Sequence, residues 1–239
     1  MSGICFDLNP DAGYVQAQMK LGILFLHHTQ NAVTLNNLQS VRRQNPKATV
    51  VTMSPDNPLP GGYCLTDTPH LKEFHSQMPK RREDFLVCSW FLQKKEKCDK
   101  WWIIEWDVFC EVPVVDYYKD VWHYSFVASS VCLPNREPSW YWFRHAAGTP
   151  ESYRPYIMGA LPFLFLFSEA ALDATCQMLL DDPFTVGNSE LRFATAANRC
   201  GYPPCGFSPP RDRITWRAFK KISGSPTIFH PVKHLVDYR

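Results

Sequence analysis

Two apolar runs separated by a helical segment stand near the start of the chain, and they constrain the fold more than any other feature. Leu21 to Leu26 is a short apolar run that predicts a buried strand. Residues 31–44 predict a helix, and Asn45-Pro46 is expected to end it. Residues 48–53 are rich in β-branched side chains, which favour a second strand. A strand, helix and strand of this length predict a parallel pair joined by a crossover helix.

Strand-like and helix-like segments continue to alternate along the chain. In order, they are a helix at 84–97, strands at 101–104, 126–131 and 161–167, a helix capped by Ser168, a helix at 189–199 capped by Asn188 and ended by Gly201, and a strand at 227–229. This alternation predicts an α/β fold with a mostly parallel central sheet flanked by helices. No linker composition divides the chain, so we expect a single domain over residues 1–239. Residues 132–158 are expected to form a long functional loop.

The composition excludes several classes of protein. Hydrophobic residues make up 45% and charged residues 20%, which is ordinary for a globular protein with a sizeable core. A net charge of +2 gives no reason to expect binding to nucleic acid or to an anionic membrane. The first twenty residues lack the pattern of a signal peptide, and no apolar run is long enough for a transmembrane segment. We therefore expect a cytoplasmic protein whose nine cysteines are reduced, and we expect Cys200 and Cys205 to be structural because their spacing is too wide for a zinc knuckle.

Residues 101–107, Trp-Trp-Ile-Ile-Glu-Trp-Asp, form an apolar run that ends at two acids. Ligands of parallel α/β sheets bind beyond the carboxyl ends of the strands. Glu105 and Asp107 are one residue apart there and can face one divalent cation from a single turn. Carboxylate oxygens suit Mg²⁺ or Mn²⁺ held between the protein and a diphosphate. The alternative is a solvated pair of loop acids after a core strand.

Several motifs follow one another in a recognisable order. They are Gly22 to Ser54, Glu105-Trp106-Asp107, the glycine-led run at 159–168, Asn188-Ser189-Glu190-Leu191-Arg192-Phe193 with Cys200-Gly201 beyond it, and Phe229-His230-Pro231. Together they resemble the motifs of a GT-A glycosyltransferase, the class that uses nucleotide sugars. The resemblance spans nearly the whole chain. It implies a single GT-A-like, Rossmann-like domain and a metal-dependent transferase.

The resemblance also implies roles for individual residues. Glu105, Asp107 and His230 would hold Mn²⁺ or Mg²⁺, and Asp107 and His230 are expected to end neighbouring strands. Glu190 would be the catalytic base of an inverting transfer. If Glu190 is not the base, Asp181 or Asp182, just upstream, are the next candidates. The donor nucleotide sugar is expected to contact residues after the first two strands and near the metal: His27, Thr29, Asp56 and Lys233. The acceptor hydroxyl compound, a glycan or another alcohol, is expected near Trp140 and Trp142, because sugar rings stack on aromatic faces. It is also expected near Gly159 and Ala160, which start the run that resembles the strand bordering the family's acceptor site.

Each of these residues also has an ordinary structural interpretation. Asp107 can cap a turn, and Glu105 can orient the ligands instead of binding the ion, since the family's motif usually opens with Asp. His230 can be a histidine satisfied near the core, and Lys233 can be a solvated lysine. A carboxylate at the position of Glu190 favours the start of a helix through the helix dipole alone.

Two rival functions remain open at the level of sequence. The first is a non-catalytic carbohydrate-binding protein on the same scaffold, which the tryptophan-rich segment between 101 and 142 also fits. The second is a metal-dependent nucleotidyltransferase or phosphatase. The nucleotidyltransferase is disfavoured, because no glycine-rich loop dense in Lys or Arg follows the first strand.

Overall fold

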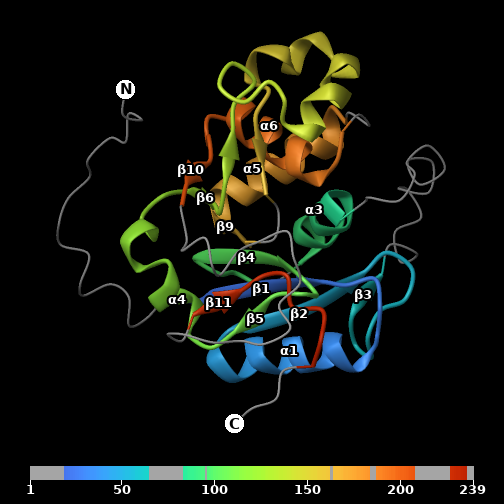
Figure 1. Cartoon of the computed structure of the whole chain (residues 1–239), viewed down its shortest axis with the longest axis vertical. Coiled ribbons are helices and arrows are strands. Elements are labelled where there is room, and N and C mark those ends of the chain that lie inside the picture. Colours follow the sequence, from blue (N-terminus) through green and yellow to red (C-terminus); the bar gives the residue numbers. More distant parts are fainter. Residues whose placement is uncertain are drawn as a thin grey trace.

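The computed structural model describes residues 19–64, 83–94, 96–161, 164–183, 187–207 and 227–235, and a seven-stranded sheet runs through them (Figure 1). Its strands, in spatial order, are β10 (Cys205–Gly206), β6 (Phe126–Ala128), β9 (Phe165–Ser168), β4 (Lys100–Glu105), β1 (Leu21–Leu26), β2 (Thr49–Ser54) and β3 (Tyr63–Cys64). All neighbouring strands are parallel except β9, which is antiparallel to both β4 and β6. The predicted α/β fold with a mostly parallel sheet is confirmed.

Helices cover both faces of this sheet (Figure 1). One face carries α3 (Glu83–Gln93), α5 (Glu169–Asp181) and α6 (Ser189–Arg199), and the other carries α1 (Ala32–Gln44) and α4 (Val114–Tyr117). Strand β1 shows why both faces are apolar. Leu24 and Leu26 pack into the core under α3, α5 and α6, whereas Ile23 and Phe25 pack into the core over α1. A strand buried on both faces reads as a continuous apolar run, as Leu21 to Leu26 does.

The helix starts follow the capping chemistry of the sequence. The side chains of Asn31, Ser168 and Asn188 accept hydrogen bonds from backbone amides in the first turns of α1, α5 and α6. Helix α6 ends at Arg199, and Gly201 follows with φ of +84°. A positive φ favours glycine, so Gly201 ends the helix as predicted.

Three predicted boundaries are wrong. The strand predicted at 126–131 divides at Ser129 into β6 and a separate β7 (Val131–Cys132), which pairs antiparallel with β8 (Gly159–Ala160). Helix α3 ends at Gln93 rather than at residue 97. The next four residues are all charged, and Lys94 pairs with Glu169 of α5 instead of continuing the helix. The strand predicted from residue 161 begins at Phe165, and residues 162 and 163 lie outside the described part of the chain.

The segment predicted as a long loop at 132–158 contains two 3₁₀ helices, η5 (Tyr141–Gly148) and η6 (Glu151–Tyr156). Figure 1 shows this segment in yellow-green at the end of the molecule farthest from α1. Tyr153 is fully buried beneath it and donates a hydrogen bond of 2.6 Å to the carbonyl oxygen of Asp182. This buried contact anchors the segment to the end of α5.

The remaining short elements lie near the carboxyl end of β4 and along α4. They are β5 (Phe109–Cys110), which pairs antiparallel with β11 (Ile228–Phe229), and η4 (Lys119–Val121). Among the described residues, all eight cysteines are free thiols. None of the described helices combines the length and the apolar character needed to cross a membrane.

Candidate functional site

The carboxyl ends of β1, β2 and β4 meet at one edge of the sheet. These strands are parallel, and the register places Leu26 beside both Glu105 and Met53. The amide of His27 then donates a 2.8 Å hydrogen bond to the carbonyl oxygen of Met53. The loops after all three strands therefore start side by side, which is where ligands of open α/β sheets bind.

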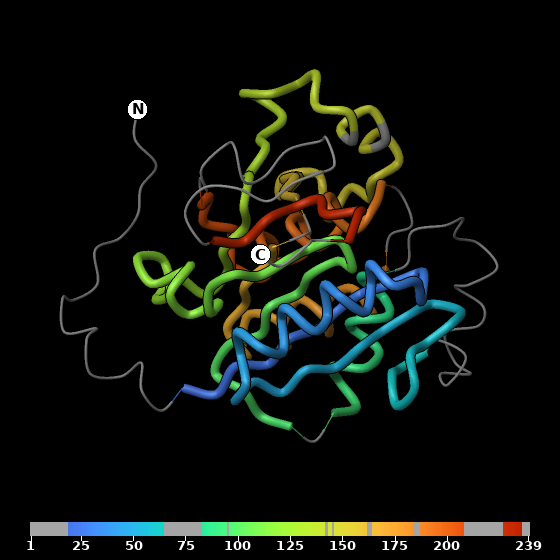
Figure 2. Tube along the Cα trace, turned by 60° about the horizontal axis from the view of Figure 1, so that its bottom comes forward, coloured from blue at the N-terminus to red at the C-terminus, as the bar shows by residue number. Residues whose placement is uncertain are grey.

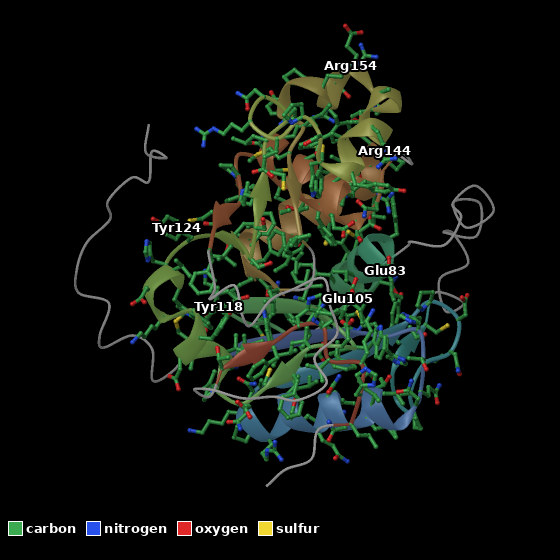
Figure 3. The ribbon with its side chains drawn as sticks, in the orientation of Figure 1. Glu83, Glu105, Tyr118, Tyr124, Arg144 and Arg154 are labelled. Carbon is green, nitrogen blue, oxygen red and sulfur yellow. The ribbon has the colours of Figure 1, made fainter. Side chains whose placement is uncertain are left out.

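Glu105, Asp107 and His230 converge at this edge. Each offers one ligand atom, and these atoms lie within 4.8 Å of one another. His230 Nε2 is 3.2 Å from Asp107 Oδ1, and both side chains are buried. The predicted convergence of the Asp107 carboxylate and the His230 ring is confirmed. Figure 3 shows Glu105 near the middle of the molecule, where it ends β4.

Lys233 completes a group that we call the metal cluster: Glu105, Asp107, His230 and Lys233. The Nζ atom of Lys233 lies 3.6 Å from Asp107 Oδ2, so its ammonium group sits beside the buried carboxylate. The lysine side chain is half exposed, so its ion pair with Asp107 is screened by solvent. The ammonium group of Lys233 stands on a flexible side chain, so it can turn towards an anion bound next to the proposed ligands without any change in the backbone.

His230 reaches Asp107 by a route that differs from the expectation. The two residues were expected to end neighbouring strands, but His230 follows β11, which pairs with β5 in a small separate sheet. The amide of Val232 donates a 2.7 Å hydrogen bond to the carbonyl oxygen of Asp107. Figure 2 shows the red 227–235 segment running beside the green chain that leaves β4, above α1. The turn after β4 bends back into β5, and this bend brings the two ligands together.

The donor atoms of the metal cluster fit a divalent cation. Two carboxylates and one imidazole form a mainly oxygen set that suits Mn²⁺, and an imidazole is less usual for Mg²⁺. Asp107 Oδ1 is buried and accepts no well-aligned hydrogen bond among the described residues. Burying a carboxylate oxygen in this state is unfavourable unless a positive charge compensates it. Asp107, His230 and Glu105 are the residues that would hold the ion.

His27 is buried, and its ring forms hydrogen bonds with the two loops that follow β1 and β2, next to the metal cluster. Its Nδ1 lies 3.2 Å from the carbonyl oxygen of Thr29, and its Nε2 accepts from the amide of Leu59 at 3.4 Å. Burial lowers the pKa of the His27 imidazole, so the ring is neutral, with its proton on Nδ1. Asp56 is exposed in the second of these loops. His27, Thr29 and Asp56 stand at the expected edge, and their contact with a donor stays a prediction.

His28 and Trp106 add an aromatic surface that the sequence reasoning missed. The two rings meet edge to face with their centroids 5.2 Å apart, and Lys233 Nζ lies 5.9 Å from the centroid of the Trp106 ring. His28 is exposed, unlike His27. The position of Trp106 between the two acids was the only local signal for this surface.

A second group, the Glu190 cluster, comprises Glu190, Cys132, Gly159 and Trp140. Glu190 is buried in the first turn of α6. Burial chiefly, with the charges of Glu137 and Glu190 adding to it, raises the pKa of the Cys132 thiol to about 12. Cys132 pairs with Gly159 across β7 and β8. A Cβ added to Gly159 would meet the ring of Trp140 at 2.1 Å, so the indole lies directly on the glycine backbone.

Of the other predicted residues, Ala160 adjoins the Glu190 cluster, whereas Asp181 and Asp182 lie outside both clusters. Ala160 is fully buried in β8, next to Gly159. Trp142 belongs to η5, but its side chain lies outside the described part of the structure. Arg199 donates a 2.6 Å hydrogen bond to the carboxylate of Asp182. Arg199 ends α6, whereas Glu190 lies in its first turn, and the two residues are about 14 Å apart along a helix that rises about 1.5 Å per residue. Asp181 accepts a hydrogen bond from Gln177.

A buried ion pair holds α6 against α3. Arg192 forms two hydrogen bonds with the carboxylate of Asp84, one of them 2.9 Å long from its terminal nitrogen, and donates a third, of 3.0 Å, to the carbonyl oxygen of Gly187. Both side chains are almost fully buried. The sequence reasoning missed this pair, because its partners are 108 positions apart.

Comparison with known proteins gives distant structural likenesses only. No family model and no curated protein matches the chain. The similar solved structures include the galactosyltransferase LgtC with donor and acceptor sugar analogs (10% identity, TM-score 0.42, 77% of this chain and 72% of that one). They also include the mannosyltransferase PcManGT from Pyrobaculum calidifontis with GDP-Man and Mn²⁺ (12% identity, TM-score 0.46, 84% of this chain and 57% of that one). A third is mouse xyloside xylosyltransferase 1 in its apo form (11% identity, TM-score 0.46, 88% of this chain and 97% of that one). The similarities are thus to glycosyltransferases, but at these scores they assign no activity to this chain.

Proposed function

We propose that this chain is a metal-dependent glycosyltransferase that moves a sugar from a nucleoside diphosphate sugar to an acceptor hydroxyl with inversion. The observation that carries the proposal is the convergence of Glu105, Asp107 and His230 at the carboxyl ends of the parallel strands. The proposal includes a single domain over residues 1–239 and a cytoplasmic location. The sheet shared by elements from residue 21 to residue 206 supports the first of these, and the free thiols support the second.

The metal cluster would receive the diphosphate of the donor. Asp107 and His230 would hold Mn²⁺ or Mg²⁺, with Glu105 as the third candidate ligand. The bound ion would supply positive charge that offsets the charge developing on the departing nucleoside diphosphate. Lys233 stands beside Asp107 and can place its ammonium group against a phosphate oxygen. The loops containing His27, Thr29 and Asp56 would surround the nucleoside, with His28 and Trp106 offering aromatic faces.

The Glu190 cluster would receive the acceptor. In an inverting transfer the acceptor oxygen forms a bond to the anomeric carbon while the bond from that carbon to the diphosphate oxygen breaks. The carboxylate of Glu190 would take the proton of the acceptor hydroxyl. Its burial in the first turn of α6 supports this role, and the engagement of Asp182 by Arg199 argues against that alternative base. Trp140, Gly159 and Ala160 would line the acceptor side, together with Trp142.

A thermal-shift series tests the proposal. A ligand that binds only the folded state raises the melting temperature by mass action. We expect uridine or guanosine diphosphate to stabilise the protein when Mn²⁺ is present and to do so much less in EDTA. The variant Asp107→Asn should lose this metal-dependent stabilisation. Equal stabilisation with and without metal would contradict the metal-bridged donor, and stabilisation by a free sugar without nucleotide would indicate the carbohydrate-binding alternative.

A further inference from the structure

Asn37 is a fully buried polar residue on the inner face of α1, between the helix and the metal cluster. Its Nδ2 atom donates a hydrogen bond of 3.0 Å to the carbonyl oxygen of Trp106 and another of 2.9 Å to the carbonyl oxygen of Val232. An amide nitrogen carries two protons, so both are used. Turning the amide over would set its oxygen against two carbonyl oxygens, and this fixes its orientation.

The two carbonyl groups belong to the two chain segments that carry the proposed metal ligands. Trp106 stands between Glu105 and Asp107, and Val232 is two residues after His230. Since both bonds leave one nitrogen at nearly equal length, the two carbonyl oxygens are held about 5 Å apart by hydrogen-bond geometry. One side chain of α1 therefore bridges two segments that are more than a hundred residues apart in the sequence, beyond the point where β5 and β11 pair.

We propose that Asn37 is a positioning residue of the metal centre, which holds Asp107 and His230 at the separation that one divalent cation needs. This inference rests on the proposed function, because it assumes that the metal cluster binds an ion. Metal affinity depends on ligands being held in place before the ion arrives, and removing a residue that orients the ligands typically weakens binding 10–100-fold. Besides the Asn37 bridge, the backbone hydrogen bond from Val232 to Asp107 joins the two segments directly.

Asn45, the residue that caps the C-terminal end of the same helix, provides a matched control. It is also buried and also binds backbone groups: its Oδ1 accepts from the amide of Val114 at 2.9 Å, and its Nδ2 donates to the carbonyl oxygen of Val41 at 2.9 Å. Val114 begins α4 and carries no metal ligand. Removing the Asn45 side chain should therefore cost stability without changing the spacing of Asp107 and His230.

The experiment measures Mn²⁺ alone, with the free ion quantified from its electron paramagnetic resonance signal in titrations of the full chain. The proteins compared are wild type, Asn37→Ala, Asn37→Ser, Asn45→Ala and Asp107→Asn, each with its melting temperature in EDTA. We expect Asn37→Ala to bind Mn²⁺ about 10–100-fold more weakly than wild type. Asn37→Ser keeps one hydroxyl donor, so its affinity for Mn²⁺ should lie between those of wild type and Asn37→Ala. The affinity of Asn45→Ala for Mn²⁺ should stay within about two-fold of the wild-type value, even if its melting temperature falls as far as that of Asn37→Ala.

The outcomes separate this inference from the proposed function. If wild type and Asn37→Ala bind equally, or if Asn45→Ala loses affinity as much as Asn37→Ala does, Asn37 does not position the ligands and the inference is overturned while the metal centre stands. If wild type shows no saturable binding, or if Asp107→Asn binds as well as wild type, the metal centre itself is overturned and the inference falls with it. If Asn37→Ala does not fold, Asn37→Ser decides the matter by the same comparison.

Discussion

The metal cluster and the Glu190 cluster are held in place in different ways. In the metal cluster, segments around residues 37, 107 and 232 are joined by backbone and amide hydrogen bonds that span most of the chain. In the Glu190 cluster, the proposed base sits on one helix that is capped by Asn188 and tied to α3 by the pair of Arg192 and Asp84. The first site depends on the spacing of separate segments, and the second depends on the placement of a single helix.

This difference means that the two clusters can fail independently. Disturbing α6 should alter proton transfer and stability while leaving the affinity for Mn²⁺ unchanged. Disturbing the turn after β4 should remove the metal while leaving α6 in place. Mn²⁺ affinity measured beside turnover and stability in the same variants tests whether the clusters are separable in this sense.

The largest effect is expected from Glu190→Gln, which keeps the shape of the side chain but removes its ability to accept a proton at neutral pH. Sugar transfer should fall by about 10²–10⁴-fold, the usual contribution of a general base. Affinity for Mn²⁺ should stay unchanged, and the melting temperature should change little. Turnover assays beside Mn²⁺ titrations measure both, with Asp181→Asn as a control whose turnover should be normal. A Glu190→Gln variant with full turnover would remove Glu190 from the mechanism.

The next largest effect is expected from Asp84→Asn, which leaves the guanidinium of Arg192 buried without its carboxylate. Breaking a buried pair on one side costs about 3–5 kcal/mol, because the remaining charge is uncompensated. Denaturant unfolding should show this decrease in the free energy of unfolding, whereas the affinity for Mn²⁺ under native conditions should equal that of wild type. Asp182→Asn breaks the more exposed pair with Arg199 and should cost no more than about 1 kcal/mol. Equal losses in the two variants would mean that burial of the first pair is not what matters.

The smallest effect is a pH dependence from His27, next to the metal cluster. Burial lowers the pKa of its imidazole below 6.5, so the unfolded chain binds the proton more readily than the folded one. This contribution to stability is complete above the unfolded pKa of about 6.5 and is lost as the pH falls towards the folded pKa. Between about pH 7.5 and about pH 5.5, wild type should therefore lose more stability than His27→Gln. Melting curves of the two proteins measure the difference, and parallel curves would contradict it.

Much of the fold could be predicted because its signals are local. The continuous apolar run of β1, the cap of α6 at Asn188 and the end of that helix at Gly201 are each decided by a few neighbouring residues. The division of the strand at Ser129 was not predictable, because the segment beyond it pairs with β8, some thirty residues later. Local patterns do not carry such long-range pairing.

The site shows the same limit. The acids at the end of β4 and the histidine after β11 could be named from their motifs, and the structure brings them together. Asn37 and the pair of Asp84 and Arg192 could not be named, because an ordinary Asn, Asp or Arg inside a helix gives no sign of a partner elsewhere in the chain. His28, which lies edge to face with Trp106, was also not named from the sequence, because the next residue after a strand gives no sign of a ring from another strand end.

The long separation of Asp107 from His230 also has a consequence for the order of synthesis. A ribosome that adds about 5–20 residues per second needs roughly 6–25 seconds to pass from one residue to the other. During that interval the emerging chain contains Glu105 and Asp107 but lacks the histidine and the lysine that stand beside them in the folded protein. The strands around β4 can already pair during this interval, but an ion bound at that stage would have only the carboxylates of Glu105 and Asp107 as protein ligands. The proposed metal site would therefore be among the last parts of the described fold to be completed, and loading with an ion would follow assembly of the sheet.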